Sequence, residues 1–174
     1  MTATSVFDQL PLEQLEEASG ELHRRAGAAL RQIGELRAED ADGEGVSPRA
    51  RVAALVVSSE LAAAALSAIA AGTEAPRGRI DLDRTVVAAL MYGAPSLDGL
   101  LGRLEQNRRM LASLARHLEP RLDELVDCAW GELSLRQVMI EHAISEPARC
   151  AQALDKVIAG LESEQLAAAQ ASDE

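Results

Sequence analysis

The chain has 174 residues, which is enough for one domain with an apolar core, and a formal net charge of -11. Apolar residues make up 48 % of it but aromatic residues only 2 %, so the core must consist of aliphatic side chains in helices, which Ala and Leu favour. The acidic charge and the lack of a basic cluster argue against nucleic-acid binding. Two cysteines, Cys128 and Cys150, are too few for a disulfide framework or a C-x-x-C metal motif, and they favour a reducing cytoplasm.

The first predicted helix begins between residues 8 and 11 and ends near Ala38. Small and apolar residues recur along it at intervals of three and four, the heptad pattern of a helix that packs along a neighbour at a shallow angle. The members of this seam are Leu12, Leu15, Ser19, Leu22, Ala26, Ala29, Ile33 and Leu36. Beside the seam, Gly20, Gly27 and Gly34 lie seven residues apart. They indicate either a closely packed neighbour or an exposed face.

The second predicted helix has Ser47 as its N-cap and Pro48 as its first residue, and it ends before Gly72. It is apolar nearly all round, which is typical of a helix in the middle of a bundle. The stretch 52–71 has Glu60 near its centre and no flanking Trp or Tyr anchors. We therefore expect a buried helix and no membrane span.

A shorter helix is predicted over residues 82–92, started by Asp81 or Asp83. Gly93 and Pro95 are expected to stop it, because glycine closes helices and proline cannot continue them.

Ser96 is the predicted N-cap of the next long helix. A leucine stripe runs from Leu97 to Leu125 with unbroken helical spacing, although Pro120 lies inside it. Proline removes a backbone hydrogen bond and clashes with the preceding turn. The continuous register predicts a kink near Glu119, with a clean break as the alternative.

The last helical region begins at Ser134, which forms a capping box with Gln137, after Gly131 has ended the preceding element. Its inward face runs from Ile140 to Leu161. Pro147 interrupts that pattern, so we expect a short helix that meets a longer one through a bend or a reset.

These elements predict an all-α fold: an antiparallel helical bundle of four long helices plus one or two short ones, with no strands. We expect a disordered N-terminus at residues 1–8, a single bundle domain at residues 9–168 and a disordered tail at residues 169–174.

Metal and cofactor chemistry finds little support in the sequence. Di-metal helical bundles use Glu-x-x-His pairs, but Gly20, Leu114 and Met139 precede the three histidines by three residues. Glycine-rich phosphate loops and nucleophile motifs are also missing. His142 and Cys150 are two helical turns apart, about 12 Å, too far for a catalytic pair. We therefore predict no catalytic residue, no metal site and no cofactor.

Polar residues that interrupt the apolar helices are the candidate ligand-binding residues. They are Glu60, Asn107, Arg108, His142 and Glu146. Arg108 occupies a position of the leucine stripe, so it needs an acidic partner, for which Glu60 or Glu146 is the expected choice. Two interpretations stay open: a salt bridge that fixes helix register, or a pocket with Arg108 as an anion clamp and the His142–Glu146 pair as a proton-transfer or ligand site.

The sequence favours a non-enzymatic protein, an adaptor or scaffold that acts through protein contacts. The specific hypothesis is self-association through the Leu12–Leu36 seam or the Leu97–Leu125 helix, with neither nucleic acid nor membrane as a partner. One alternative is a small-molecule-binding protein or enzyme with a mid-bundle polar pocket around Arg108, His142 and Glu146. Another is an acidic inhibitory partner of the immunity or antitoxin kind.

Overall fold

The computed structural model describes residues 6–35, 37–42, 45–76, 84–94 and 96–172, and most of these residues are helical. The long helices are α1 (Leu12–Ile33), α2 (Pro48–Ala70), α4 (Leu97–His117) and α6 (Glu146–Ser172). The short elements are η1 (Val6–Gln9), α3 (Arg84–Gly93), η2 (Glu119–Arg121), β1 (Leu125–Cys128), β2 (Gly131–Ser134), α5 (Leu135–Ile140) and the π-helical turn η3 (Glu141–Ser145). The mostly helical class is confirmed.

Some predictions fall on residues outside this description. They concern the disorder of residues 1–5 and 173–174, the seam residue Leu36, and the helix start at Asp81 or Asp83.

Serine caps fix the helix starts, as predicted. The side chains of Ser47, Ser96 and Ser134 each accept a hydrogen bond from a backbone N–H in the first turn of the following helix. Such caps satisfy backbone donors that have no partner within the helix. The end of α1 was predicted too late, because Gly34 adopts a φ of 77° and stops the helix at Ile33.

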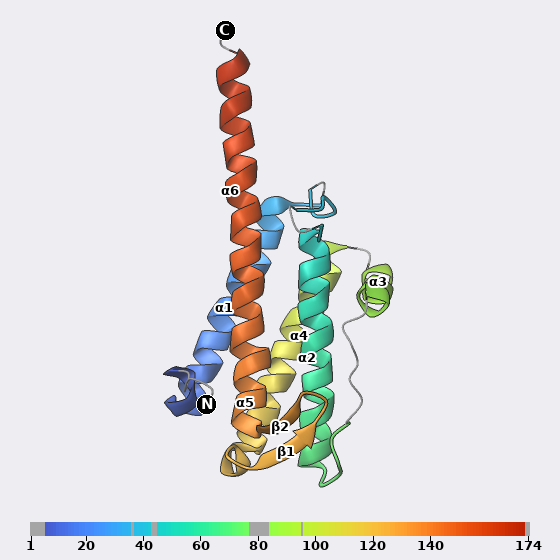
Figure 1. The fold of residues 1–174 in the computed structure, drawn as a ribbon, viewed down its shortest axis with the longest axis vertical. Helices are drawn as coiled ribbons and strands as arrows, with labels where there is room; N and C mark the ends of the chain where they lie inside the picture. Colours follow the sequence, from blue (N-terminus) through green and yellow to red (C-terminus); the bar gives the residue numbers. More distant parts are fainter. Residues whose placement is uncertain (1–5, 36, 43–44, 77–83, 95, 173–174) are drawn as a thin grey trace.

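The long helices do not all alternate in direction. α1 and α6 run one way, and α2 and α4 run the other way (Figure 1). At one end Arg49 of α2 donates to the carbonyl of Ala94, just before α4 (2.7 Å), and at the other end Arg121 donates to the carbonyl of Ile69 (3.3 Å). The antiparallel expectation fails for this pair because the connection from α2 to α4 leads back to the end of the bundle at which α2 begins, so α4 starts beside the start of α2.

A two-stranded antiparallel sheet corrects the prediction of no strands. α4 ends at His117, and the chain passes through η2, which contains Pro120, into β1 and β2. The predicted kink was wrong, and the break named as its alternative is correct. Leu125 pairs with Ser134 across the hairpin and is 66 % exposed, although it continues the leucine spacing. Pro120 lacks the backbone N–H that a helix needs, and this outweighs the leucine spacing that would continue the helix.

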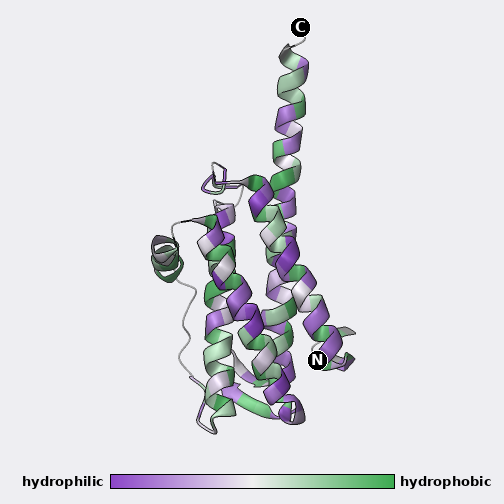
Figure 2. Cartoon of the chain, turned by 180° about the vertical axis from the view of Figure 1, so that it is seen from behind, coloured by the Kyte–Doolittle hydropathy of each residue, from purple (hydrophilic) through white to green (hydrophobic). Residues whose placement is uncertain are grey.

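α2 lies in the middle of the fold, packed against α3, α4 and α6. Val52, Val56 and Leu66 are almost completely buried. By length and composition alone, α2 could cross a membrane, but 67 % of its most apolar window is buried inside the fold. Seen from behind, hydrophilic residues follow the faces of α1 and α4 that point to the viewer (Figure 2). The burial of α2 agrees with the central helix expected from its sequence.

Candidate functional site

The five candidate residues do not converge on one site. Glu60 pairs with Arg103 (3.1 Å), and the amide of Asn107 donates to the backbone carbonyl of Val56 (3.2 Å). Arg108 pairs with Glu105, and only His142 and Glu146 of the five are in contact.

Arg108 takes its acidic partner from its own helix. Its guanidinium donates two hydrogen bonds of 2.8 Å to Glu105, in place of the expected Glu60 or Glu146. The hydrogen bond from Arg108 is the main cause that lowers the pKa of Glu105 to about 2, and Arg109 adds a second bond. A carboxylate three or four residues away on the same helix lies within reach of a guanidinium, so Arg108 can pair with Glu105 without a partner from another helix. Arg108 is therefore already paired with a carboxylate of its own helix.

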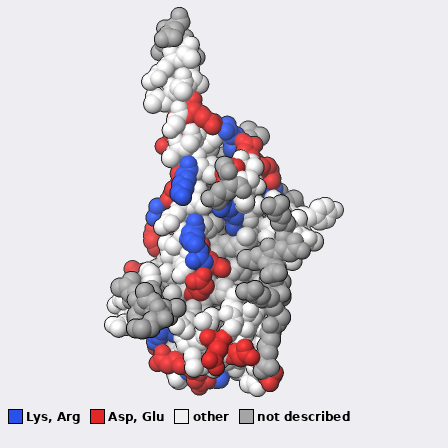
Figure 3. All heavy atoms as spheres, in the orientation of Figure 1, with Lys and Arg blue, Asp and Glu red and all other residues white. Residues whose placement is uncertain are grey.

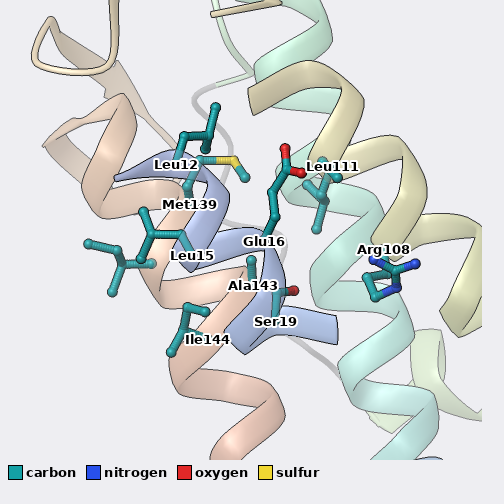
Figure 4. A pocket seen from close by; sticks show the side chains of 11 residues that line it. Leu12, Leu15, Glu16, Ser19, Arg108, Leu111, Met139, Ala143 and Ile144 are labelled. Carbon is teal, nitrogen blue, oxygen red and sulfur yellow. The ribbon is translucent and has the colours of Figure 1, made fainter. Parts of the chain in front are cut away.

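The space beside Arg108 is small and apolar. Figure 4 shows leucines of α1 and α4 facing Met139, Ala143 and Ile144 across it. Its volume is about 20 Å³, which is room for roughly one water molecule. The predicted polar pocket around Arg108 therefore does not form at this place.

Three polar side chains meet between α2 and the start of α6, and we call them the buried polar cluster: Ser58, His142 and Glu146. The Nδ1 atom of His142 lies 2.8 Å from the Ser58 hydroxyl and 3.5 Å from the Glu146 carboxylate. The hydroxyl of Ser58 also donates a hydrogen bond to that carboxylate. His142 is 2 % exposed and Ser58 3 % exposed, so both are shielded from water.

The two hydrogen bonds of Ser58 show which ring nitrogen of His142 carries a hydrogen. A serine hydroxyl has one hydrogen. Because Ser58 gives it to Glu146, its oxygen must accept from His142, so Nδ1 of His142 carries a hydrogen. The cluster is thus a carboxylate and a hydroxyl that orient an imidazole through its Nδ1 atom.

Burial of Glu146 opposes its ionisation, but the nearby imidazole of His142 and the hydrogen bond from Ser58 outweigh it. Together with the charges of His142 and Arg149, they lower the pKa of the carboxyl group. Glu146 is therefore an anion at neutral pH, held in a largely apolar bundle by the Ser58 hydroxyl and the neighbouring His142 ring.

α5, η3 and α6 form one continuous rod (Figure 1). His142 and Glu146 are four residues apart and in contact, so they lie on the same side of this rod. Pro147 has no N–H, so the ordinary bond to the fourth preceding carbonyl is lost there. The N–H of Glu146 instead bonds to the carbonyl of Glu141, five residues earlier. This turn is the reset expected near Pro147. Single π turns inside α-helices are frequent at functional sites.

The hairpin covers the cluster with the only tryptophan of the chain. The ring centroids of Trp130 and His142 are 4.2 Å apart, and the ring planes are tilted by 48°. Trp130 comes just before β2, so the hairpin that the sequence missed supplies this contact.

An open groove lies next to the cluster, between the start of α2 and the start of α6. It has a volume of about 360 Å³, and Glu146 forms part of its wall. Its other lining residues include Arg51, Leu55, Arg149 and Cys150. Burial raises the pKa of the Cys150 thiol to about 12, so the thiol is not a nucleophile at neutral pH. The groove can contact a ligand through Glu146 but offers no activated cysteine.

The cluster offers an imidazole, a carboxylate and a hydroxyl. In the described part of the chain, no group of three or more His, Cys, Asp or Glu side chains is arranged to hold a metal ion.

Sequence reasoning paired His142 with Glu146 but left Ser58 and Trp130 out of the site. Ser58 did carry a signal, as a polar residue within an apolar helix. Comparison of the chain with protein-family models, curated proteins and solved structures finds no match. The fold and site therefore define a class only: a helical bundle with a buried Ser–His–Glu cluster.

Proposed function

We propose that the chain is a small-molecule-binding protein whose site combines the α2–α6 groove with the buried polar cluster. The main observation that supports this proposal is the position of Glu146. Its carboxylate is held by Ser58 and lies beside His142, and the residue also forms part of the wall of an open groove of about 360 Å³. Pockets of this size with a few fixed polar groups are typical of small-ligand sites.

The charges of the groove indicate the kind of ligand. Arg149 is paired with Glu141 (2.6 Å), and Arg51 is paired with Asp42. Glu146 accepts from Ser58 and lies near His142, but no cationic Lys or Arg pairs with it among the described residues. A ligand with an N–H or ammonium donor and an apolar part that packs on Leu55 suits this arrangement.

A thermal-shift screen of small amines, amides and nucleosides tests this proposal, with Glu146→Gln as the test variant. We expect compounds that raise the melting temperature of the wild type and change the emission of Trp130, the only tryptophan. Glu146→Gln should weaken the response by roughly tenfold or more in affinity, because a charged hydrogen bond is lost. Glu162→Gln, an exposed glutamate on the same helix, is the control. Compounds that bind both variants as well as the wild type would contradict the site.

A second candidate function, protein contact, is favoured by the far end of α6. This helix continues past the rest of the bundle (Figure 1), and residues 162–171 are all exposed. The protruding end carries few charged side chains (Figure 3), and Leu166 is 63 % exposed. An isolated helical end of this length is only marginally stable in water. A partner that packs along it, such as a second copy of the chain, would stabilise it.

The contact surface proposed here differs from the two named from the sequence. Leu12, Leu15 and Ile33 of the seam are buried within one chain, as are Leu100 and Leu101 of α4. Those side chains are already used inside the bundle.

Sedimentation velocity at micromolar concentration tests self-association. We expect the full chain to form dimers and a chain that ends after Leu161 to be monomeric, because the truncation removes the exposed turns. Leu166→Glu should also shift the equilibrium to monomer, whereas Glu162→Gln should not. A full-length chain that sediments as a monomer would remove this candidate.

A further inference from the structure

His23 has a buried ring in which only one nitrogen is hydrogen-bonded. The residue is 5 % exposed, and its Nδ1 lies 2.8 Å from the backbone carbonyl of Ser19. Because a carbonyl only accepts, Nδ1 must carry the hydrogen of the neutral ring. Nε2 is buried and has no hydrogen-bond partner among the described residues. A second proton on the ring would therefore place both a charge and an unsatisfied N–H in the interior.

The charges of α4 do not make a proton on His23 more favourable. Burial is the main cause that lowers the pKa of His23 below its ordinary value of 6.5, and the charge of Arg108 lowers it further. The hydrogen bond with Ser19 and the charge of Glu105 act in the opposite direction but do not reverse the shift. Glu105 is already held by Arg108 (2.8 Å) and Arg109 (2.7 Å). The folded chain therefore favours the neutral ring.

Acidic groups of the other elements that contact α1 are held by arginines. α2, η3 and α6 all contact α1. The ion pairs on these elements are Glu60 of α2 with Arg103, Glu141 of η3 with Arg149, and Asp155 of α6 with Arg25. Within the part of the chain that the structure describes, the charges that act on the pKa of His23 are those of Arg108 and Glu105. No anion is thus placed to stabilise a charged His23 ring.

The other buried histidine, His142, has a different environment. Its Nδ1 lies 3.5 Å from the Glu146 carboxylate, so a proton on that ring would be next to an anion. His23 instead has the guanidinium of Arg108 nearby. A fall in pH therefore acts against burial at His23 in particular.

His23 also lies in the least apolar part of the α1 seam. Between Leu15 and Ala26, the buried residues of α1 are Ser19 and His23. Leu15 belongs to a small apolar cluster with α5 and η3, whereas Ala26 belongs to the large cluster with α2 and α4. The two halves of α1 are thus held by separate apolar contacts, and few apolar contacts hold the turns between them. Segments with few buried apolar contacts open most easily.

We propose that His23 is an acid-sensitive latch: protonation of its buried ring opens the middle of α1, residues 16–26, away from α4. Opening brings Nε2 to water, which supplies the acceptor that the interior lacks. It also uncovers Leu101 and Leu104 of α4, so that a fall in pH creates an apolar surface. The latch is separate from the α2–α6 groove and does not depend on the function proposed for that groove.

The direction of the pH effect follows from the pKa of the ring. In the closed state the pKa of His23 is below 6.5, whereas an opened, hydrated ring has the ordinary value of 6.5. Above that pH the ring is neutral in both states and the latch stays closed. As the pH falls below 6.5, the open state binds the proton first, so opening becomes easier until the pH reaches the closed-state pKa. Between about pH 7.5 and about pH 5, this linkage can increase the open fraction by at most about 30-fold.

Amide hydrogen exchange of the intact chain, followed by mass spectrometry at about pH 7.5 and about pH 5, tests the latch. After correction for the intrinsic pH dependence of exchange, we expect residues 16–26 to open roughly tenfold more at the lower pH. The central helix α2 should change by less than about twofold, because its core contacts do not depend on His23. NMR titration of the ring should give a pKa of His23 below its ordinary value.

Two variants assign the effect to His23. His23→Gln keeps an N–H donor for the Ser19 carbonyl but cannot take up a proton, so residues 16–26 should open equally at both pH values. The control is His117→Gln, which removes the exposed histidine at the end of α4 and should keep the wild-type difference. A pH difference that persists in His23→Gln would overturn the proposal. So would equal opening of residues 16–26 in the wild type at the two pH values, and this result is decisive even if His23→Gln fails to fold.

Discussion

Replacement of Leu154 by alanine is expected to lower the free energy of unfolding by about 2–5 kcal/mol. Leu154 is completely buried and belongs to the same core cluster as Leu30, Val52 and Leu100, which come from three other helices. Truncation would leave a cavity where α6 is held against the bundle, and a close-packed core relaxes only partly around such a space. Urea denaturation followed by circular dichroism measures the change.

Leu166→Ala makes the same chemical change near the other end of α6. Leu166 is 63 % exposed, so we expect a change within about 0.5 kcal/mol when the chain is monomeric. The pair of variants tests whether α6 is clamped in its first half and free in its last turns. A loss at Leu166 equal to that at Leu154 in the monomer would show that the last turns pack on the bundle.

The helices could be predicted because their signals are local. The caps at Ser47, Ser96 and Ser134 and the proline at residue 48 act within one turn, so the sequence shows them directly. The apolar spacing likewise predicts the buried face of each helix.

The hairpin and the course of the chain depend on more distant interactions. Leu118 and Leu122 are buried as the leucine stripe predicts, but Leu125 belongs to a strand and faces solvent. Spacing alone cannot distinguish a continued helix from a chain that turns after Pro120 and keeps two leucines in the core. The direction of α4 depends on the end of the bundle to which the chain returns after α2, which is a tertiary property.

The candidate site was predicted only in part, because one of its contacts is local in the sequence and the other is not. His142 and Glu146 are four residues apart, and this local spacing brings them together. Ser58 lies 84 residues before His142, so only the packing of α2 against the π turn reveals the contact. Arg108 was assigned to distant acids, whereas Glu105, three residues away, was within reach throughout.

Replacement of Ser58 by alanine is expected to cost about 1–3 kcal/mol of stability, because both of its partners stay buried or half-buried without it. Its hydroxyl is the acceptor for His142 and a donor to Glu146. Ser59→Ala is the matched control: Ser59 is also buried, but its hydroxyl bonds only to the carbonyl of Leu55 in its own helix. That carbonyl keeps its helical partner, so we expect a smaller loss.

The pH dependence of Ser58→Ala distinguishes a lost hydrogen bond from a general loss of packing. The folded-state pKa of Glu146 lies below its ordinary value of 4.5, so its ionisation stabilises the fold above that pH. This contribution disappears as the pH falls through the folded-state pKa. Without Ser58 its hydrogen bond, one of the interactions that lower the pKa of Glu146, is gone, so the pKa should rise towards 4.5 and the contribution should shrink. NMR titration of the Glu146 carboxyl carbon measures the shift, and an unchanged pKa in Ser58→Ala would mean that Ser58 does not hold the carboxylate at the groove.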